Sequence, residues 1–277
     1  MSKHSRPQNK FVVSLIDIII PVLDMSGLVI NCLKSIPDAA KDLSYQIIIV
    51  DNGSKIEELK AYREFGKELF GDKLHILEQR RNIGFPAAIN RGARFGYSPL
   101  LFFLNDDVVL YPNSLNKLVM AMDDPTVGAV GMKLLFPKDS NDPKRPAGKI
   151  QHVGLSTDIK GNFIHNFVGW SPDNPRVLRI KDSYAITGAA MMTRRNLFKQ
   201  IKGFNEEYGQ GTYEDVEYSL ILRDMGYNIR IEQEAIGEHF VGATAMDKQI
   251  QYPLQHNQML LHEHRGGQLL YTEWEIW

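Results

Sequence analysis

The stretch LLFFLNDD at residues 100–107 sets five apolar residues directly before an asparagine and two aspartates. A short apolar run bounded by polar residues is typical of a strand that is buried on both faces of a parallel sheet. In open α/β sheets, ligands bind beyond the carboxyl ends of the strands. The stretch therefore predicts a buried strand with a ligand site at its end.

Similar apolar runs alternate with helical patterns on both sides of this stretch. We predict strands at 16–20, 47–50, 74–77, 100–104, 127–136, 185–193 and 228–232, and helices at 28–36, 54–70, 85–97, 112–122 and 214–225. Residues 138–149 hold two prolines, a glycine and many charges, which indicates a loop. The alternation predicts an α/β fold with a single domain and a mostly parallel central sheet flanked by helices.

Three helix starts carry local signals. Ser54 and Glu57 have the spacing of a capping box, and Pro86 suits the first turn of its helix. Thr212 is a candidate N-cap for the helix at 214.

Composition excludes several classes of protein. The 277 residues carry a net charge of −1 without a block of like charges, so a nucleic-acid groove is not indicated. The single cysteine, Cys32, excludes an internal disulfide and fits a reducing compartment as a buried thiol. The apolar run at 11–22 is interrupted and too short to span a bilayer. We expect a soluble, cytoplasmic protein, and contact with a membrane surface or a homo-oligomer is left open.

Three polar clusters follow three predicted strands. Asp51 and Asn52 follow the second strand, the RNIG segment at 81–84 follows the third, and Asn105 to Asp107 follow the fourth. Each cluster alone is best explained as a turn, because Asp, Asn and Gly are common turn residues. Together, at one rim of a sheet, they indicate a binding site.

Asp106 and Asp107 favour a divalent cation. Adjacent carboxylates repel each other unless a cation lies between them and another anion. Oxygen ligands suit Mg²⁺ or Mn²⁺, which commonly bind one or two carboxylates together with substrate phosphates. The sequence has neither G-x-G-x-x-G nor a P-loop, so a metal-bound diphosphate is favoured over a dinucleotide or a P-loop nucleotide.

Two further candidates lie in the second half of the chain. Glu214 and Asp215 begin a predicted helix, where acidic residues also suit the helix dipole. The same dipole should lower the pKa of Asp215 and keep it ionised. His239 follows a strand, where a structural histidine is the more common case. It gains weight because a metal site needs another ligand.

Taken in order, several motifs resemble the family-2 glycosyltransferases, which are inverting enzymes with the GT-A fold, and most closely their rhamnosyltransferase-like members. The resemblance covers residues 16–244. The motifs are IIIPV (18–22), IVDNGS (49–54), RNIGF (81–85), FLNDD (103–107), TGAA (187–190), GFNE (203–206), Glu214-Asp215 and His239.

The resemblance implies a role for each matching residue. Asp51 would contact the nucleotide base, and Pro21, Arg81, Asn82 and Asp106 would also line the nucleotide. Asp107 would be the main metal carboxylate and His239 a further metal contact. Asp215 would be the general base, with Glu214 as its supporting neighbour. Position 105 is Asn where many members have Asp, which makes Asp107 carry more of the metal binding.

The implied reaction is metal-dependent transfer of a hexosyl or deoxyhexosyl group from a UDP- or dTDP-linked sugar to a hydroxyl of a glycan or lipid-linked acceptor. Asp215 would deprotonate that hydroxyl, while Mn²⁺ or Mg²⁺ and Arg81 would neutralise the leaving diphosphate. Two alternatives remain: a sugar nucleotidyltransferase, for which a glycine-rich loop after the first strand is expected, and a non-catalytic nucleotide-sugar- or carbohydrate-binding subunit.

We expect one glycosyltransferase domain at 11–245 and a C-terminal tail of unknown role at 246–277. Residues 11–125 would form the nucleotide-binding half and 126–245 the acceptor-side half. His262 and His264 of the tail are better explained by an exposed helical face than by a metal site. The tail could cover the acceptor site, pair two subunits or rest on a membrane.

Overall fold

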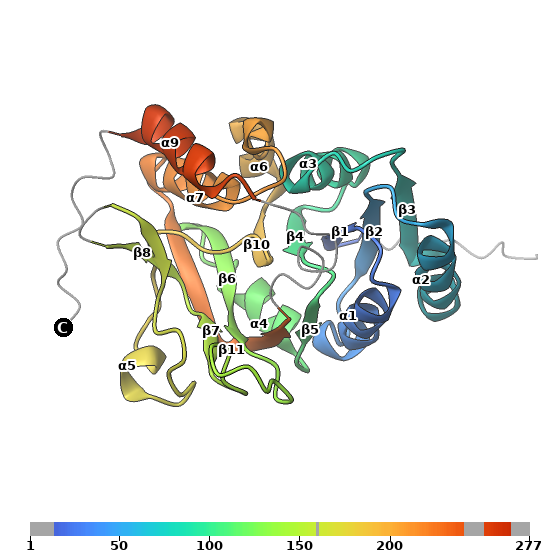
Figure 1. Ribbon diagram of the computed structural model, residues 1–277, viewed down its shortest axis with the longest axis horizontal. Helices are drawn as coiled ribbons and strands as arrows, with labels where there is room; N and C mark the ends of the chain where they lie inside the picture. The colour runs from blue at the N-terminus through green and yellow to red at the C-terminus, as the bar shows by residue number, and fades with distance from the viewer. Residues whose placement is uncertain (1–13, 159–160, 241–251, 267–277) are drawn as a thin grey trace, which may run out of the picture.

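The computed structural model describes residues 14–158, 161–240 and 252–266, and shows one sheet between two layers of helices (Figure 1). Its strands are β1 (Ile16–Val22), β2 (Tyr45–Asp51), β3 (Leu74–Glu78), β4 (Leu100–Leu104), β5 (Val108–Leu110), β6 (Val127–Leu135), β7 (Ile150–His152), β8 (Leu155–Thr157), β9 (Phe163–His165), β10 (Ala190–Arg194) and β11 (Asn228–His239). Its α-helices are α1 (Ser26–Ala39), α2 (Ile56–Phe70), α3 (Phe85–Phe95), α4 (Ser114–Ala121), α5 (Pro175–Leu178), α6 (Arg195–Ile201), α7 (Glu214–Asp224) and α9 (Leu254–Arg265).

Within the described residues, nine strands form the main sheet in the order β3-β2-β1-β4-β10-β6-β11-β5, with β7 paired to β6. Strands β1 to β4 are parallel, as predicted. β10 runs antiparallel to both β4 and β6, so the second half of the sheet is mixed. The α/β single-domain prediction is confirmed. The direction of β10 could not be predicted, because an apolar strand buried on both faces looks the same in either direction.

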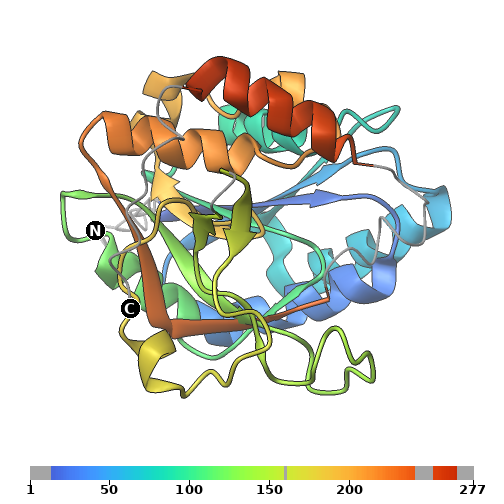
Figure 2. The ribbon, with the colours of Figure 1, turned by 60° about the vertical axis from the view of Figure 1, so that its left-hand side comes forward.

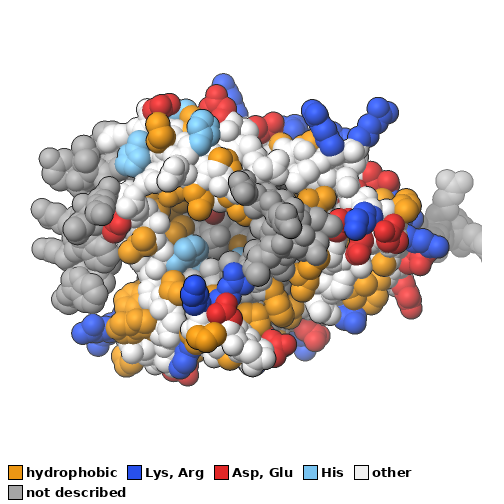
Figure 3. All heavy atoms as spheres, in the orientation of Figure 1, with side chains coloured by type: hydrophobic (Ala, Val, Ile, Leu, Met, Phe, Trp, Pro, Cys, Tyr) orange, Lys and Arg blue, Asp and Glu red, His pale blue; other side chains and the backbone are white. Residues whose placement is uncertain are grey.

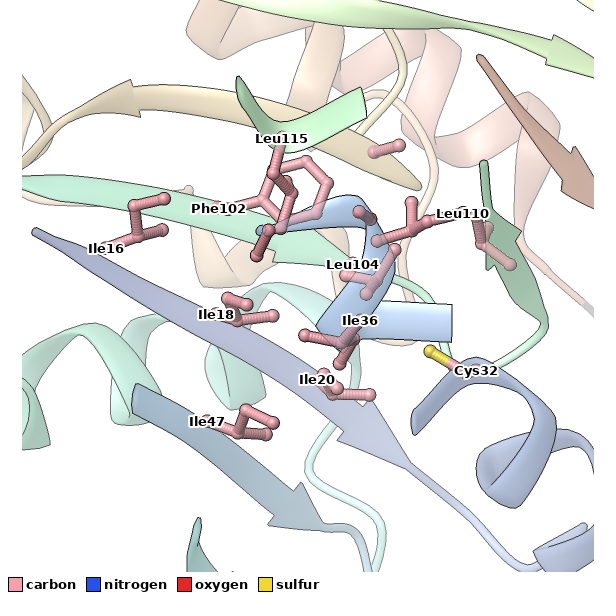
Figure 4. Close-up of a cluster of buried hydrophobic side chains, with 14 of the residues drawn as sticks. Ile16, Ile18, Ile20, Cys32, Ile36, Ile47, Phe102, Leu104, Leu110 and Leu115 are labelled. Atoms are coloured by element: carbon pink, nitrogen blue, oxygen red, sulfur yellow. The ribbon is translucent and has the colours of Figure 1, made fainter. Parts of the chain in front are cut away.

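The alternation of side chains along β1 builds two cores. Ile18 and Ile20 point to one face, where they pack with α1 and α4 (Figure 4). Ile19 points to the other face, toward α3, α6 and α7. Burying each such side chain stabilises the fold by about 1.5–3 kcal/mol. Because both faces are covered, the carboxyl ends of the strands are left as the place for a site.

Two capping predictions are wrong. Ser54 does not cap α2; its Oγ accepts the Asp24 N–H at 2.7 Å, and the N-cap position is Lys55, which has no side-chain cap. The Lys55 N–H is instead bound by Asp24 Oδ1 at 2.6 Å. Tyr213, not Thr212, precedes α7, again with no side-chain cap. At α2, the carboxylate of Asp24, which is distant in sequence, therefore binds the backbone N–H at the start of the helix.

Two strands differ most from their predicted limits. β10 begins only at Ala190, and β11 continues past residue 232 to His239. Sequence analysis missed β7, β8, β9 and β5, and the three residues of β5 directly follow the acidic cluster and pair with the end of β11. In the described segments, no helix is long and apolar enough to cross a membrane.

Candidate active site

The pairing of β5 with β11 brings His239 to the acidic cluster. His239 is aligned with Val108, and the Phe240 N–H donates to the Asp107 carbonyl at 3.0 Å. Across this ladder His239 Nε2 lies 3.2 Å from Asp107 Oδ1, and both side chains are buried. Two residues 132 positions apart in the sequence are thus neighbours because β5 and β11 pair with each other.

Gln151 on β7 sets the orientation of the His239 ring. Its Oε1 lies 3.1 Å from His239 Nδ1, and an amide oxygen only accepts, so Nδ1 carries a proton. Nε2 then faces Asp107, and a proton or a cation has to lie between them. A metal-binding histidine usually has a hydrogen-bond acceptor on its other ring nitrogen, and Gln151 is in that position here. Sequence analysis missed Gln151, and no motif marks it.

The Asp107 carboxylate has the properties of a cation ligand. Burial raises its pKa, but the charge and hydrogen bond of His239 outweigh burial and hold the pKa of Asp107 below its usual value. Asn105 also hydrogen-bonds this carboxylate. Oδ1 is buried and faces His239 Nε2 at 3.2 Å. An ionised carboxylate beside a histidine nitrogen fits Mn²⁺ or Mg²⁺.

The described residues contain no group of three or more His, Cys, Asp or Glu side chains that could hold a metal by themselves. Asp107 and His239 would therefore need oxygen ligands from a substrate, which is the usual way in which Mg²⁺ is bound beside phosphates.

Asp106 faces the end of β1. The Leu23 backbone N–H hydrogen-bonds its carboxylate, while burial and the neighbouring Asp107 raise the pKa of Asp106 well above its ordinary value. Cys32 lies beneath the cluster, fully buried, with Sγ 3.6 Å from the Asn105 carbonyl oxygen. Burial raises the pKa of the Cys32 thiol well above its usual value, which keeps it protonated and confirms that it is a buried thiol.

A short backbone segment links the two acidic clusters. The Gly188 N–H donates to Asp215 Oδ2 at 2.8 Å, and the Ala189 carbonyl accepts the Asn105 N–H at 2.9 Å. Consecutive residues of the TGAA motif thus hold the start of α7 on one side and the start of the Asn105–Asp107 cluster on the other. The two acidic clusters therefore lie on either side of the TGAA segment.

The expectation of a lowered pKa for Asp215 is wrong. Burial raises the pKa of Asp215 despite the Gly188 and Val216 N–H groups that bind it. Burial and then Asp215 raise the pKa of Glu214 well above its usual value, and Glu214 Oε2 has no partner in the described part of the chain. Desolvation here outweighs the helix dipole, because the dipole contributes only about 0.3–2 kcal/mol while full burial penalises the charged form more strongly.

The predicted nucleotide residues lie at neighbouring loops. Gly53 has φ 87° and lies so close to the Arg81 backbone that a Cβ would come within 2.9 Å of it. Gly84 has φ 86° and packs against the Gly209 carbonyl in the same way. Glycine is needed at both positions, for its conformation and for the space. These two contacts bring the loops after β2 and β3 to the loop before α7.

Asn82 and Arg81 differ in what they contact. Asn82 Oδ1 accepts the Gly84 N–H at 2.8 Å, and its Nδ2 donates to Gln210 Oε1 at 2.9 Å, so Asn82 bridges two loops. Arg81 is exposed and lines a hollow of about 410 Å³ together with Arg91 of α3. Pro21 is half-buried in β1, paired with Val50 of β2.

Asp51 is buried at the end of β2, and its Oδ1 accepts hydrogen bonds from the Tyr62 hydroxyl at 2.8 Å and from the Ser54 N–H at 3.1 Å. We expect Asp51→Asn to weaken binding of UDP or GDP, measured by calorimetry, about tenfold to a hundredfold, because a lost buried polar contact costs about 1–3 kcal/mol. Tyr62→Phe is the matched control, since it removes the tyrosine contact and keeps the carboxylate. Equal losses in the two variants would mean that Asp51 serves only the fold.

A second pair of residues that the sequence did not reveal is His152 and His165. Their Nδ1 atoms are 2.8 Å apart. His152 Nε2 accepts the backbone N–H groups of Gly154 and Thr187, at 3.2 and 3.4 Å, so the proton of His152 is on Nδ1. His165 must then accept at Nδ1 and carry its proton on Nε2. Thr187 belongs to the TGAA segment, so this pair supports the segment that hydrogen-bonds Asp215.

These histidines predict sensitivity to acid. Burial, and then the neighbouring His165, lower the pKa of the fully buried His152 well below its ordinary value of 6.5, near which the unfolded chain takes up the proton. The unfolded state therefore binds more protons below that value, and the free energy of unfolding should fall as the pH drops below about 6.5. The urea midpoint measured across this range should fall less in His152→Phe. An unchanged profile in that variant would assign the acid sensitivity to other groups.

The surface is hollowed in the region of β6 and β8, below α7 and α9, and a histidine side chain is exposed in the hollow (Figure 3). In the turned view, the hairpin of β8 and β9 stands in front of the main sheet (Figure 2). The arrangement combines the Asp107–His239 pair, the adjacent carboxyls of Glu214 and Asp215, and three converging loops.

Comparison with known proteins identifies the family of this chain. The model of "Glycosyl transferase family 2" matches residues 17–201. The chain belongs to this family. It is 29% identical over 222 residues, 77% of the chain, to the O-antigen biosynthesis protein RfbC of Myxococcus xanthus. It is 28% identical over 220 residues to the uncharacterized protein y4gI of Sinorhizobium fredii. The matches span 16% and 23% of these relatives, so both are much longer than this chain.

Solved structures confirm the GT-A fold. GalNAc-T7, solved with UDP, GalNAc and Mn²⁺, superposes with a TM-score of 0.68 at 16% identity, over 94% of this chain and 49% of that one. The mannosyltransferase PcManGT of Pyrobaculum calidifontis, in complex with GDP-Man and Mn²⁺, gives 0.59 at 18% identity, over 91% and 71%. TarS of S. aureus with UDP-GlcNAc gives 0.55 at 14% identity, over 80% and 57%. The chain is thus a family-2 glycosyltransferase with a GT-A-type fold.

Proposed function

We propose that this glycosyltransferase uses a nucleotide-diphospho-sugar donor, UDP- or dTDP-linked, and transfers a hexosyl or deoxyhexosyl group with inversion. The acceptor is a hydroxyl of a glycan or lipid-linked glycan. The observation that carries the proposal is the Gly188–Ala189 segment, which hydrogen-bonds Asp215 on one side and Asn105 on the other. Two consecutive residues thus hold the proposed base and the proposed diphosphate site. This suits a displacement in which the acceptor hydroxyl attacks the same sugar carbon from which the diphosphate departs.

Asp107 and His239 are the residues proposed to hold Mn²⁺ or Mg²⁺. Two similar structures were solved with Mn²⁺, which supports the assignment. When bound, the cation would neutralise charge on the departing diphosphate. Gln151 keeps the His239 ring in place through Nδ1, and Asn105 holds the Asp107 carboxylate. The chain thus supplies a prearranged pair of ligands, and the diphosphate oxygens would complete the set.

Asp215 is proposed to take the proton of the acceptor hydroxyl as that oxygen attacks. Its raised pKa suits this role, because a general base is most effective when its pKa lies nearer the working pH. The Gly188 and Val216 N–H groups and the Thr187 side chain hydrogen-bond the carboxylate and fix its orientation. Glu214 supports the pair as a second buried carboxyl. Asp51, Pro21, Arg81, Asn82 and Asp106 form the proposed nucleotide side of the site.

The two halves of the domain have different proposed tasks. Residues 11–125 hold the loops after β1 to β4, which would bind the nucleotide, and 126–245 hold α7 and β11, which would face the acceptor. RfbC is an O-antigen biosynthesis protein, and a glycan acceptor agrees with that role.

Donor hydrolysis tests the function directly. Incubation with UDP-, dTDP- and GDP-linked sugars in Mn²⁺, followed by detection of released nucleoside diphosphate, should give turnover with at least one donor and none in EDTA. Release of pyrophosphate from a sugar phosphate and a nucleoside triphosphate would instead identify a nucleotidyltransferase. Donor binding without turnover, even with acceptor glycans added, would identify a binding subunit.

A further inference from the structure

Helix α9 lies along α7, which carries the proposed base (Figures 1 and 2). Leu261 of α9 is buried in a cluster with Val216 and Leu220 of α7. His264 Nδ1 is 2.8 Å from Glu217 Oε1, and Arg265 pairs with Asp224 near the end of α7. His262 and His264 lie on an exposed face of α9, as predicted, while the opposite side of the helix packs on α7. From the exposed face, His264 also reaches the buried Glu217.

The backbone directly before α7 has an unusual conformation. Gly209 and Gly211 have φ values of 60° and 120°, and Thr212 and Tyr213 have φ values of 80° and 73°. Positive φ is common for glycine but costly for a β-branched residue such as threonine. Residues in such conformations persist only where the surrounding structure holds them. The carbonyl groups of this loop need partners outside the helix that follows.

Asn257 of α9 supplies those partners. Its side chain is fully buried, and its Nδ2 lies 3.1 Å from the Tyr208 carbonyl oxygen, 2.8 Å from that of Gly211 and 3.1 Å from that of Thr212. Thr212 Oγ1 is a further acceptor at 3.1 Å. One side-chain amide thus binds successive acceptors of a loop about 46 positions earlier in the chain.

The same loop is held from its other side by the proposed nucleotide loop. Gln210 Oε1 accepts a hydrogen bond from Asn82, and the Gln210 carbonyl accepts the Phe85 N–H at 3.4 Å. Glu214 and Asp215 follow within a few residues. The conformation of the loop therefore sets where α7 begins and how Asp215 meets the Gly188 N–H.

We propose that Asn257 is a positioning residue: by holding the Gly209–Tyr213 loop in its left-handed conformation, it aims Asp215 at the reacting hydroxyl. This inference rests on the proposed function of Asp215. It makes α9 a part of the catalytic unit.

Two variants of one site test the proposal. Asn257→Leu and Asn257→Asp keep the size of the side chain and remove the N–H donors. We expect kcat for hydrolysis of the accepted donor to fall about a hundredfold, while KM and the affinity for the nucleoside diphosphate change less than twofold. That split follows because the base is misplaced and the donor site is not. Equal effects on kcat and KM, or an unchanged kcat, would overturn the proposal.

Leu261→Ala is the matched control on the same helix. It removes the apolar contact of α9 with α7 and keeps the Asn257 hydrogen bonds, so it should lower the thermal midpoint and leave kcat of the folded enzyme within about threefold. If Leu261→Ala lowers kcat as much as the Asn257 variants, the role of Asn257 is only to dock α9.

Amide hydrogen exchange separates failure of the inference from failure of the proposed function. In Asn257→Leu, exchange should accelerate at residues 211–216 and stay unchanged in the last turns of α7, whether or not a donor has been identified. Unchanged exchange at 211–216 would overturn the inference by itself. If exchange accelerates at 211–216 in Asn257→Leu but the wild-type enzyme turns over no nucleotide-sugar, Asn257 holds the loop. The catalytic assignment of Asp215, and with it the positioning role of Asn257, would then be wrong.

Discussion

Asp215→Asn is expected to lower kcat by about 10²–10⁴-fold, the usual contribution of a positioned general base, with little change in donor affinity. The amide cannot take the acceptor's proton. It also has one accepting oxygen where the carboxylate uses two, so either the Gly188 or the Val216 N–H loses its partner. That loss should cost about 1–3 kcal/mol of stability, which is measured separately by the thermal midpoint.

Glu214→Gln is the matched control for this prediction, since it makes the same chemical change one residue earlier. Glu214 Oε2 has no hydrogen-bond partner in the described part of the chain, so its replacement should cost less in both turnover and stability. If Asp215→Asn turns over donor at nearly the wild-type rate and Glu214→Gln does not, the base is Glu214.

The dependence of kcat on pH belongs to the same experiment. A base works only when ionised, and burial raises the pKa of Asp215. Turnover should therefore rise with pH through that raised pKa, so the acid limb should lie above the ordinary aspartate value of about 3.9. The limb should disappear from the residual activity of Asp215→Asn.

Asp107→Ala is expected to abolish the metal-dependent part of nucleotide binding. Wild-type protein titrated with UDP or GDP should bind more tightly in Mn²⁺ than in EDTA, and the difference should vanish in the variant. The expected size of the effect follows from other metal sites. There, losing a residue that hydrogen-bonds a ligand costs about 10–100-fold in metal affinity, so losing a direct ligand should cost at least about 100-fold. Equal wild-type affinity in Mn²⁺ and EDTA would contradict the metal site.

Gln151→Leu provides the graded control. It keeps both proposed ligands and removes only the acceptor that orients the His239 ring. The affinity for Mn²⁺ in the presence of nucleotide should fall by about 10–100-fold, less than in Asp107→Ala. A larger loss in Gln151→Leu than in Asp107→Ala would place the cation elsewhere.

The sequence alone determined the elements whose signal is local. The limits of β4 at Leu100–Leu104 were predicted correctly, because an apolar run between polar residues depends only on its own composition. The acids at its end, the RNIG loop and the GT-A family followed from the order of motifs along the chain. These features need no knowledge of distant residues.

Tertiary structure alone decided what holds the site. Gln151 reaches His239 across 88 positions, and Asn257 reaches the loop before α7 across about 46, so no local pattern marks either residue. The raised pKa of Asp215 has the same origin, since burial depends on everything packed around the carboxyl and the helix dipole only on its own helix. Composition and spacing select the groups that do chemistry, while their orientation and charge state depend on neighbours that only the folded chain provides.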